Sequence, residues 1–200
     1  MILKIVQAGE PVLRARARAL TTKEIRSKPI RELIEQMRET MRDAPGVGLA
    51  APQVGQPLQL AVIEDREDYQ RNVNGERLAL LERKPVPFHV VINPLITLRG
   101  AGAPARFFEG CLSIKGLVGL VARGLDVHVD ALNEKAEPVS IDAHGWYARI
   151  LQHEIDHLQG VLCIDRMNLR SLMTQENYSQ YWGDKPIDEV SRVLELDRTI

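Results

Sequence analysis

The stretch between Gly145 and Gly160 constrains the fold more strongly than any other part of the 200-residue sequence. Apolar residues recur there at the three- and four-residue spacing of an α-helix, and they are Trp146, Ala148, Ile150, Leu151, Ile155 and Leu158. Gly160 follows the last of them, at a position typical of a helix end. A helix that is apolar on much of its surface has to be covered by other elements. The segment therefore predicts a fold built around one buried central helix.

Shorter patterns predict the elements that cover this helix. Helical spacing at residues 30–41 and 188–196 predicts an N-terminal and a C-terminal helix. Apolar runs at residues 58–63 and 89–92 predict two buried strands. The polar residues 64–87 between them predict an excursion away from the sheet.

A hairpin and a tight loop complete the expected sheet. Strict alternation of apolar and polar residues over 125–131, followed by a short apolar run at 139–141, predicts a hairpin with one face in water. The Gly-rich segment 46–53 (GVGLAAPQ) predicts a tight loop that leads into a strand. We therefore expect an α+β fold, with mixed or antiparallel strands around the central helix and with N-terminal and C-terminal helices.

Charge and cysteine content exclude several functional classes. The chain has 26 basic and 27 acidic residues, so it has no overall basic field for nucleic acid. Its longest apolar runs fall far short of the ~20 residues that a membrane span needs. A chain of this size folds without disulfides, so Cys111 and Cys163 are expected as thiols in a reducing compartment. We expect a cytoplasmic protein that contacts neither a membrane nor nucleic acid directly.

The predicted central helix carries His153, Glu154 and His157, an HExxH pattern. Residues four apart lie about 40° from each other around a helix, so both imidazoles can bind one metal ion. Glu154 lies about 100° further round than His153, which suits a carboxylate that takes a proton from attacking water. The alternative is two buried structural histidines beside a surface carboxylate. The metal site is favoured because burying these polar groups without a function is costly.

The sequence offers three candidates for a third ligand. Cys163 lies six residues after His157, where some zinc endopeptidases have a histidine, and Glu176 is the nearest downstream carboxylate. Cys163 belongs to the apolar run 160–164, which reads as a buried strand or turn and favours an inert core residue. Cys111 follows a glycine in the polar segment FEGCLS and is the better thiolate. An endopeptidase that uses Cys163, and a protein with a purely structural metal, remain alternatives at this point.

Three segments resemble, in the same order, the signature motifs of the peptide deformylase family. They are residues 46–53 (GVGLAAPQ), 109–113 (EGCLS) and 152–157 (QHEIDH). The resemblance extends from about Gly9 to Met167 and covers most of the chain. It implies a deformylase-like catalytic domain over residues 1–170, followed by a C-terminal tail, residues 171–200, with a helix.

The resemblance implies a metal site and a general base. The residues that match the family's ligands are Cys111, His153 and His157, and the ion they bind is ferrous iron, or zinc, nickel or cobalt in its place. Glu154 matches the general base. The resemblance also implies an ion pair between Glu109 and Arg123 that positions the Cys111 loop.

Other matching positions are expected to contact the substrate. The side-chain amide of Gln53 and the backbone N–H of Leu112 match the donors that stabilise the oxyanion formed from the formyl oxygen. Gly46, Gly48 and Gly110 are expected where the backbone comes close to the bound peptide.

The activity that the resemblance implies is removal of the formyl group from the N-terminal formylmethionine of new polypeptides, with release of formate. The implied partners are N-formylmethionyl nascent peptides and, transiently, the ribosome. Gly145, Trp146 and residues 148–150 are more similar to deformylases of plant organelles, mitochondria and some bacteria than to the best-known bacterial form. The organelle matrix is therefore the alternative to the cytoplasm, if the sequence is a processed mature form.

Overall fold

The computed structural model of the protein describes residues 1–71, 73–100 and 102–196. Its helices are α1 (Thr22–Ile25), α2 (Lys28–Asp43), α3 (Gly75–Leu80), α4 (Gly145–Leu158), α5 (Cys163–Arg166), α6 (Gln175–Asn177) and α7 (Ile187–Val193). Its strands are β1 (Gly48–Ala50), β2 (Leu60–Asp65), β3 (Val86–Arg99), β4 (Ala105–Cys111), β5 (Ile114–Arg123), β6 (Asp126–Leu132), β7 (Pro138–His144) and β8 (Met173–Thr174). The predicted α+β class is confirmed.

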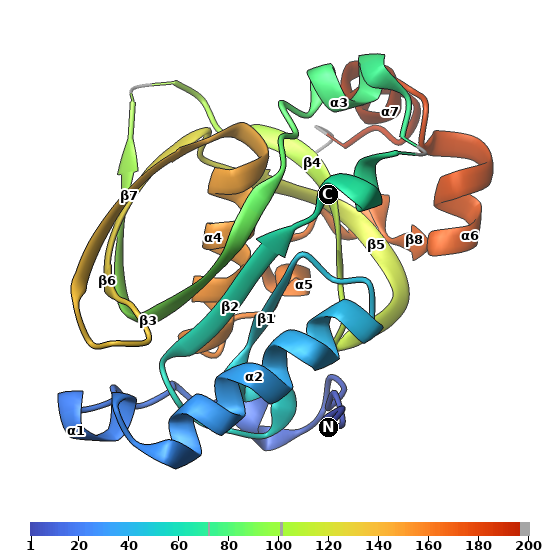
Figure 1. The fold of residues 1–200 in the computed structure, drawn as a ribbon. Coiled ribbons are helices and arrows are strands. Elements are labelled where there is room, and N and C mark those ends of the chain that lie inside the picture. The colour runs from blue at the N-terminus through green and yellow to red at the C-terminus, as the bar shows by residue number, and fades with distance from the viewer. Residues whose placement is uncertain (72, 101, 197–200) are drawn as a thin grey trace.

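The strands form two antiparallel sheets in the described part of the chain. One has the order β1-β2-β3-β6-β7 and the other the order β4-β5-β8. In Figure 1, α2 crosses in front of β1 and β2, and α4 lies behind them, within the curve of β3, β6 and β7. The helix predicted to be central is thus enclosed by the larger sheet.

Both faces of β2 are buried, because a helix covers each of them. Leu60 and Val62 pack with α2, whereas Ile63 points to the other face and packs with α4. This explains why the strand is a continuous apolar run rather than an alternating one. On α2, the residues at helical spacing that face the sheet are Ile30, Ile34, Met37 and Met41.

The β6–β7 hairpin has the predicted alternation. Val127 and Val129 of β6 are buried against α4, whereas Asp130, the residue next to Val129, is exposed. The polar excursion is also present, and between β2 and β3 it contains a 3-10 helix at Glu67–Gln70 and the short helix α3. None of the helices in the described residues combines the length and apolarity that a membrane span requires.

Two local predictions are wrong. Residues 46–53 do not form only a loop, because Gly48–Ala50 is the fully buried strand β1, paired with β2. The run around Cys163 is not a strand or simple turn but begins the short helix α5, where the Asp165 carboxylate accepts the backbone N–H of Leu162. In both cases a local hydrogen-bond pattern, which composition does not reveal, decides the conformation.

The C-terminal segment packs on the smaller sheet. β8 pairs with β5, and Val190 of α7 is fully buried beside Leu120 of β5. The predicted helix over 188–196 corresponds to α7, which begins one residue earlier and ends at Val193. The last residues of the predicted tail, 197–200, lie outside the described part of the chain.

Candidate metal centre

Helix α4 brings His153, Glu154 and His157 to one place. The two imidazole rings lie with their centroids 5.0 Å apart, as residues one helical turn apart should. Glu154 and His157 are buried, and His153 is partly exposed. The helix thus presents two imidazoles and a carboxylate in the interior of the protein.

Cys111 is the last residue of β4 and lies beside the two histidines. The β4–β5 register shifts between Gly110 and Cys111, which turns the chain at this point. Its Sγ lies 3.3 Å from Nε2 of His157, and one donor atom from each of Cys111, His153 and His157 lies within 4.8 Å of the others. Among the described residues this is the one group of three such donors with that spacing, and Cys163 and Glu176 are not in it.

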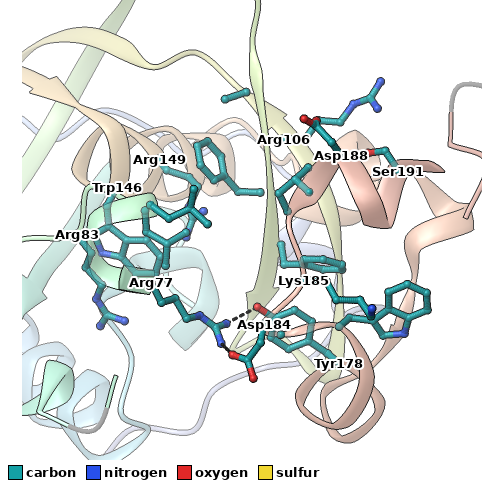
Figure 2. Close-up of a pocket in the computed structure, with 18 of the residues that line it drawn as sticks. Arg77, Arg83, Arg106, Trp146, Arg149, Tyr178, Asp184, Lys185, Asp188 and Ser191 are labelled. Carbon is teal, nitrogen blue, oxygen red and sulfur yellow. Dashed lines mark hydrogen bonds and ion pairs between the residues drawn. The ribbon is translucent and has the colours of Figure 1, made fainter. Parts of the chain in front are cut away.

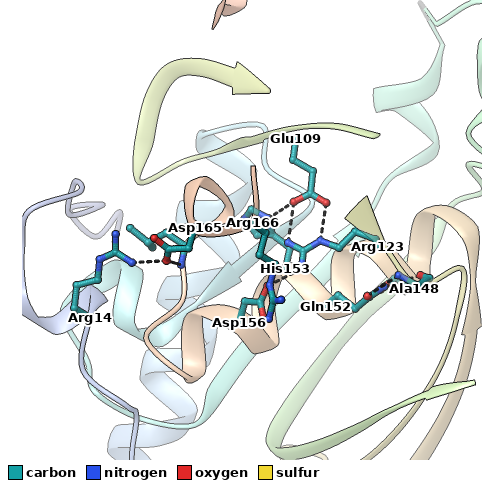
Figure 3. A network of polar contacts seen from close by, with 11 residues as sticks. Arg14, Glu109, Arg123, Ala148, Gln152, His153, Asp156, Asp165 and Arg166 are labelled. Atoms are coloured by element: carbon teal, nitrogen blue, oxygen red, sulfur yellow. Dashed lines mark hydrogen bonds and ion pairs between the residues drawn. The ribbon is translucent and has the colours of Figure 1, made fainter. Parts of the chain in front are cut away.

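A network of charged side chains contacts the donor group through His153. Arg123 donates two hydrogen bonds of 2.9 Å to the carboxylate of Glu109, which confirms the predicted ion pair. The same carboxylate accepts a hydrogen bond of 3.1 Å from Nδ1 of His153, as Figure 3 shows. The carboxylate of Asp156 accepts hydrogen bonds from the guanidinium groups of Arg123 and Arg166. The network therefore orients His153 so that its Nε2 is free to bind a ligand.

The network also sets the charge of Glu109. Burial favours the neutral form of this carboxyl, but the hydrogen bonds from His153 and Arg123 outweigh it and lower its pKa to about 2. The negative charge of Glu109 in turn supports a proton on Nδ1 of His153. No spacing rule identifies Asp156 and Arg166, because their roles in the network depend on the fold.

The carboxylate of Glu154 is buried, and one of its oxygens lacks a hydrogen-bond partner among the described residues. Its Oε2 is buried and has no hydrogen-bond partner among the described residues, and burial raises its pKa to about 7. A Cβ atom at Gly48 would lie 2.2 Å from Oε1 of Glu154, so only glycine leaves room for this carboxylate. Gly48 therefore shapes the site through its packing on Glu154.

Gln53 directs its amide group at the same centre. Its Oε1 accepts the backbone N–H of Ala50 at 2.8 Å, which leaves Nε2 facing Sγ of Cys111 at 3.5 Å and Oγ of Ser113 at 3.4 Å. The side chain is buried, so its orientation is fixed by these contacts. A Cβ atom at Gly46 would lie 2.9 Å from the end of the Leu112 side chain, which would have to shift to make room for it.

A cavity of about 480 Å³ opens onto this group. Of the nine predicted site residues, eight line it: Gly46, Gly48, Gln53, Gly110, Cys111, Leu112, His153 and Glu154. His157 lies beneath them and is 1% exposed. The fold thus brings residues from three separate sequence motifs to one cavity.

The donor set fits a divalent transition metal. One thiolate and two imidazoles are typical ligands of zinc and of iron, and three protein ligands leave a position for a reacting group. Burial lowers the pKa of His157, so this imidazole is neutral, as a metal ligand must be. The hydrogen bond with the Cys163 thiol and burial both raise the pKa of the Cys111 thiol, and a bound cation would favour its thiolate instead.

Cys163 and the three histidines outside the HExxH pattern are not part of the donor group. Cys163 is buried as expected, although its thiol contacts Cys111, which the sequence did not indicate. His89 contacts the Tyr147 hydroxyl at 2.9 Å, His128 contacts Asp142 and His144 contacts Asp126. These three histidines take no part in the donor group.

The chain is similar in sequence to proteins of one known family. A family model described as polypeptide deformylase matches residues 2–172. Peptide deformylase 1A, chloroplastic, of Solanum lycopersicum is 44% identical over 173 residues, which are 86% of this chain and 62% of that protein. Peptide deformylase 1 of Bifidobacterium longum is 44% identical over 186 residues, which are 93% of this chain and 82% of that protein.

A solved structure shows the same fold. The class I type b peptide deformylase of Acinetobacter baumannii with Met-Ala-Ser bound has a TM-score of 0.73 and 30% identity, over 84% of this chain and 99% of that chain. The present chain spans less than two thirds of the length of the tomato relative. The family model, the bacterial relative and the shared fold agree, and the chain belongs to the polypeptide deformylase family.

Proposed function

We propose that this protein is a metal-dependent hydrolase that removes the formyl group from N-terminal formylmethionine of newly synthesised polypeptides and releases formate. One observation carries the proposal: the Cys111, His153 and His157 donors and the unpartnered Glu154 carboxylate lie together at one cavity. Membership of the deformylase family supports it.

Cys111, His153 and His157 would hold the metal ion, for which we propose ferrous iron, with zinc, nickel or cobalt as substitutes. When bound, the ion supplies positive charge that polarises a carbonyl and acidifies water. The donor set supports a borderline-soft divalent ion over magnesium or calcium, which prefer oxygen ligands.

Glu154 is proposed to accept the proton of the attacking water. A pKa near 7 places the carboxyl where it can both take a proton and give it to the leaving amine at neutral pH. Its Oε2 has no competing partner among the described residues, which supports this role.

Gln53 and Leu112 are proposed to stabilise the oxyanion that forms on the formyl oxygen. Nε2 of Gln53 is a neutral donor held at the donor group by the Ala50 contact, and Leu112 lines the same cavity directly after Cys111. Preorganised donors at such an oxygen are worth about 3 kcal/mol of barrier each.

The substrate peptide is proposed to lie along Gly46 and Gly48, with Gly110 on the other side of the cavity. β1 is an edge strand, so its outer side can pair with an extended peptide as a further strand. Recognition through the backbone would let the enzyme act on many sequences after the formylmethionine.

The proposed partners are N-formylmethionyl nascent peptides and, transiently, the ribosome that carries them. We propose the cytoplasm as the location. The organelle matrix is the alternative, and the chloroplastic name of the tomato relative supports it.

Metal analysis and a formyl-Met peptide assay on anaerobically purified protein test this function. Cys111→Ala is expected to lose metal and activity together, whereas the matched variant Cys163→Ala should keep its metal. If Cys163→Ala instead loses the metal and Cys111→Ala retains it, the endopeptidase alternative is correct and the proposal is wrong.

A further inference from the structure

Arg149 is a buried cation on the helix that carries the metal ligands. It stands four residues before His153 on α4, so both side chains project from the same face. Arg149 is only 7% exposed. Its guanidinium carbon lies 4.1 Å from the centroid of the Trp146 ring and 4.6 Å from that of the Phe107 ring. Aromatic rings cover the guanidinium group, which leaves the N–H groups at its edges for an acceptor.

Arg149 has no hydrogen-bond acceptor or ion-pair partner among the described residues, where its guanidinium packs on these two rings. The indole Nε1 of Trp146 is a second buried donor that has no partner there. Burial lowers the pKa of Arg149 to about 10, so the group is still charged at neutral pH. A buried charge without a counter-ion is costly unless something else pairs with it.

The neighbouring cations already have partners. Arg83, which also stacks on Trp146, donates two hydrogen bonds of 2.8 Å to Asp65. Arg123 is paired with Glu109 and Asp156. Glu109, the acidic group whose charge acts on Arg149, is thus already neutralised. The positive charge of Arg149 is the one in this cluster that lacks compensation among the described residues.

Arg149 lies in the wall between two cavities. One is the cavity at the metal centre, and the other, of about 1370 Å³, lies between α3, β4 and the C-terminal segment. Both are lined by Arg83, Phe108, Trp146, Arg149 and Gln175. Figure 2 shows Arg149 and Trp146 side by side in the wall of the larger cavity. A ligand in either cavity can therefore reach this group.

We propose that Arg149 forms a carboxylate-binding subsite beside the metal centre. A carboxylate presents two oxygens that match two N–H groups at the edge of a guanidinium. This inference deepens the proposed function and rests on it. A deformylase meets two kinds of carboxylate: the formate that it releases, and an acidic side chain near the start of a substrate peptide.

Tryptophan fluorescence measures formate binding without any turnover. The chain has two tryptophans, so Trp182→Phe leaves Trp146, which stacks on Arg149, as the sole reporter. Sodium formate is expected to change the emission at about tenfold lower concentration than sodium chloride at the same ionic strength. Arg149→Met in this background should weaken the formate response about tenfold, and Arg149→Lys should restore it only in part, because lysine lacks the planar fork.

Arg192→Met is the matched control, since it removes an exposed cation at the rim of the larger cavity. It is expected to change the formate response less than about twofold, because exposed charges are screened. If Arg149→Met fails to fold, equal responses of the Trp182→Phe protein to formate and chloride still exclude formate as the ligand.

Matched peptides test the second carboxylate. The ratio of kcat/KM for formyl-Met-Asp-Ser over formyl-Met-Asn-Ser should exceed one in the wild type and fall towards one in Arg149→Met, if substrate side chains use the subsite. The proposal stands if either formate or the acidic peptide shows a response that depends on Arg149, and it is wrong if neither does. A protein that binds formate through Arg149 but releases none from formyl peptides would refute the proposed function alone.

Discussion

Gly48 is the residue on which the position of the Glu154 carboxylate depends most directly. Gly48→Ala would place a methyl group 2.2 Å from Oε1, so either the carboxylate or β1 has to move. We expect a stability loss of about 1–3 kcal/mol and a turnover at least about tenfold lower. Thermal unfolding and the formyl-Met peptide assay measure the two effects.

Gly75→Ala is the matched control, because a Cβ atom at Gly75 meets nothing within 4 Å. Gly75 is the first residue of α3 and does not line the cavity at the metal centre. A Gly48→Ala protein that is as stable and active as the Gly75→Ala protein would show that the Glu154 position tolerates a side chain there.

The Glu109 carboxylate gives a pH dependence with a definite sign. Its pKa falls from 4.5 to about 2 on folding, so its charge stabilises the protein above about pH 4.5, and this stabilisation disappears as the pH falls through 2. Glu109→Gln should therefore lower the free energy of unfolding at pH 7 by roughly 3 kcal/mol, and less as the pH falls. Urea unfolding of metal-free protein between pH 7 and pH 2.5 measures this.

Glu67→Gln, at an exposed acid, is the control for Glu109→Gln and should have little effect at any pH. A difference between wild type and Glu109→Gln that is the same at pH 7 and pH 2.5 would mean that the variant disturbs packing rather than the ion pair with Arg123.

Sequence spacing was enough to predict some site residues and not others. The angular relation of His153, Glu154 and His157 is fixed within one helix, so it can be read from three positions. Cys111 comes from β4, far from α4 in the sequence, so only its glycine-bearing context and the family resemblance favour it over Cys163. The position of the Arg149 guanidinium depends on rings from two elements, Trp146 of α4 and Phe107 of β4, which no local pattern encodes.

At the scale of elements, the C-terminal helix α7 is expected to contribute to the stability of the whole chain. Val190 is fully buried against Leu120 of the smaller sheet, whereas Val193 on the same helix is 56% exposed. Val190→Ala should reduce the free energy of unfolding by about 2 kcal/mol, because it leaves a cavity. Val193→Ala is the control, with an expected change within about 0.5 kcal/mol.

Chemical denaturation of both variants measures this difference. Equal stability of Val190→Ala and Val193→Ala would show that α7 is a separate tail that does not support the fold. A difference in a single cooperative transition would show that the predicted boundary after residue 170 does not divide two folding units.

The elements that the sequence predicts well are those whose burial follows a simple period. The β6–β7 hairpin alternates because one of its faces packs on the core, and α4 shows apolar residues at helical spacing because the fold buries most of its surface. The sequence does not predict the β4–β5 hairpin, because glycines at 110, 116 and 119 interrupt the pattern of both strands. At Gly119 the missing side chain makes room for Met167, a contact distant in the sequence.

At the scale of the whole molecule, the fold encloses α4 but leaves the metal centre open on one side. Cys111 is only partly buried and lines the 480 Å³ cavity. Dioxygen that enters there can oxidise a ferrous ion or the Cys111 thiolate, while zinc has no accessible redox change. The iron form should therefore lose activity in air, and the zinc form should be stable although slower.

Half-lives of the iron and zinc forms in aerated buffer measure this difference. A reductant or catalase is expected to extend the half-life of the iron form alone. Equal half-lives of the two forms in air would mean that the protein shields its metal from oxygen.

Formate release by wild type and Glu154→Gln, measured together with metal content, tests the proposed deformylase mechanism most directly. The wild type should release formate from a formyl-Met peptide. Glu154→Gln should keep its metal, since Glu154 is not in the donor group, but release formate at least about 100-fold more slowly because it lacks the proton acceptor. A Glu154→Gln protein that keeps its metal and its full rate would contradict the assignment of Glu154 as the base.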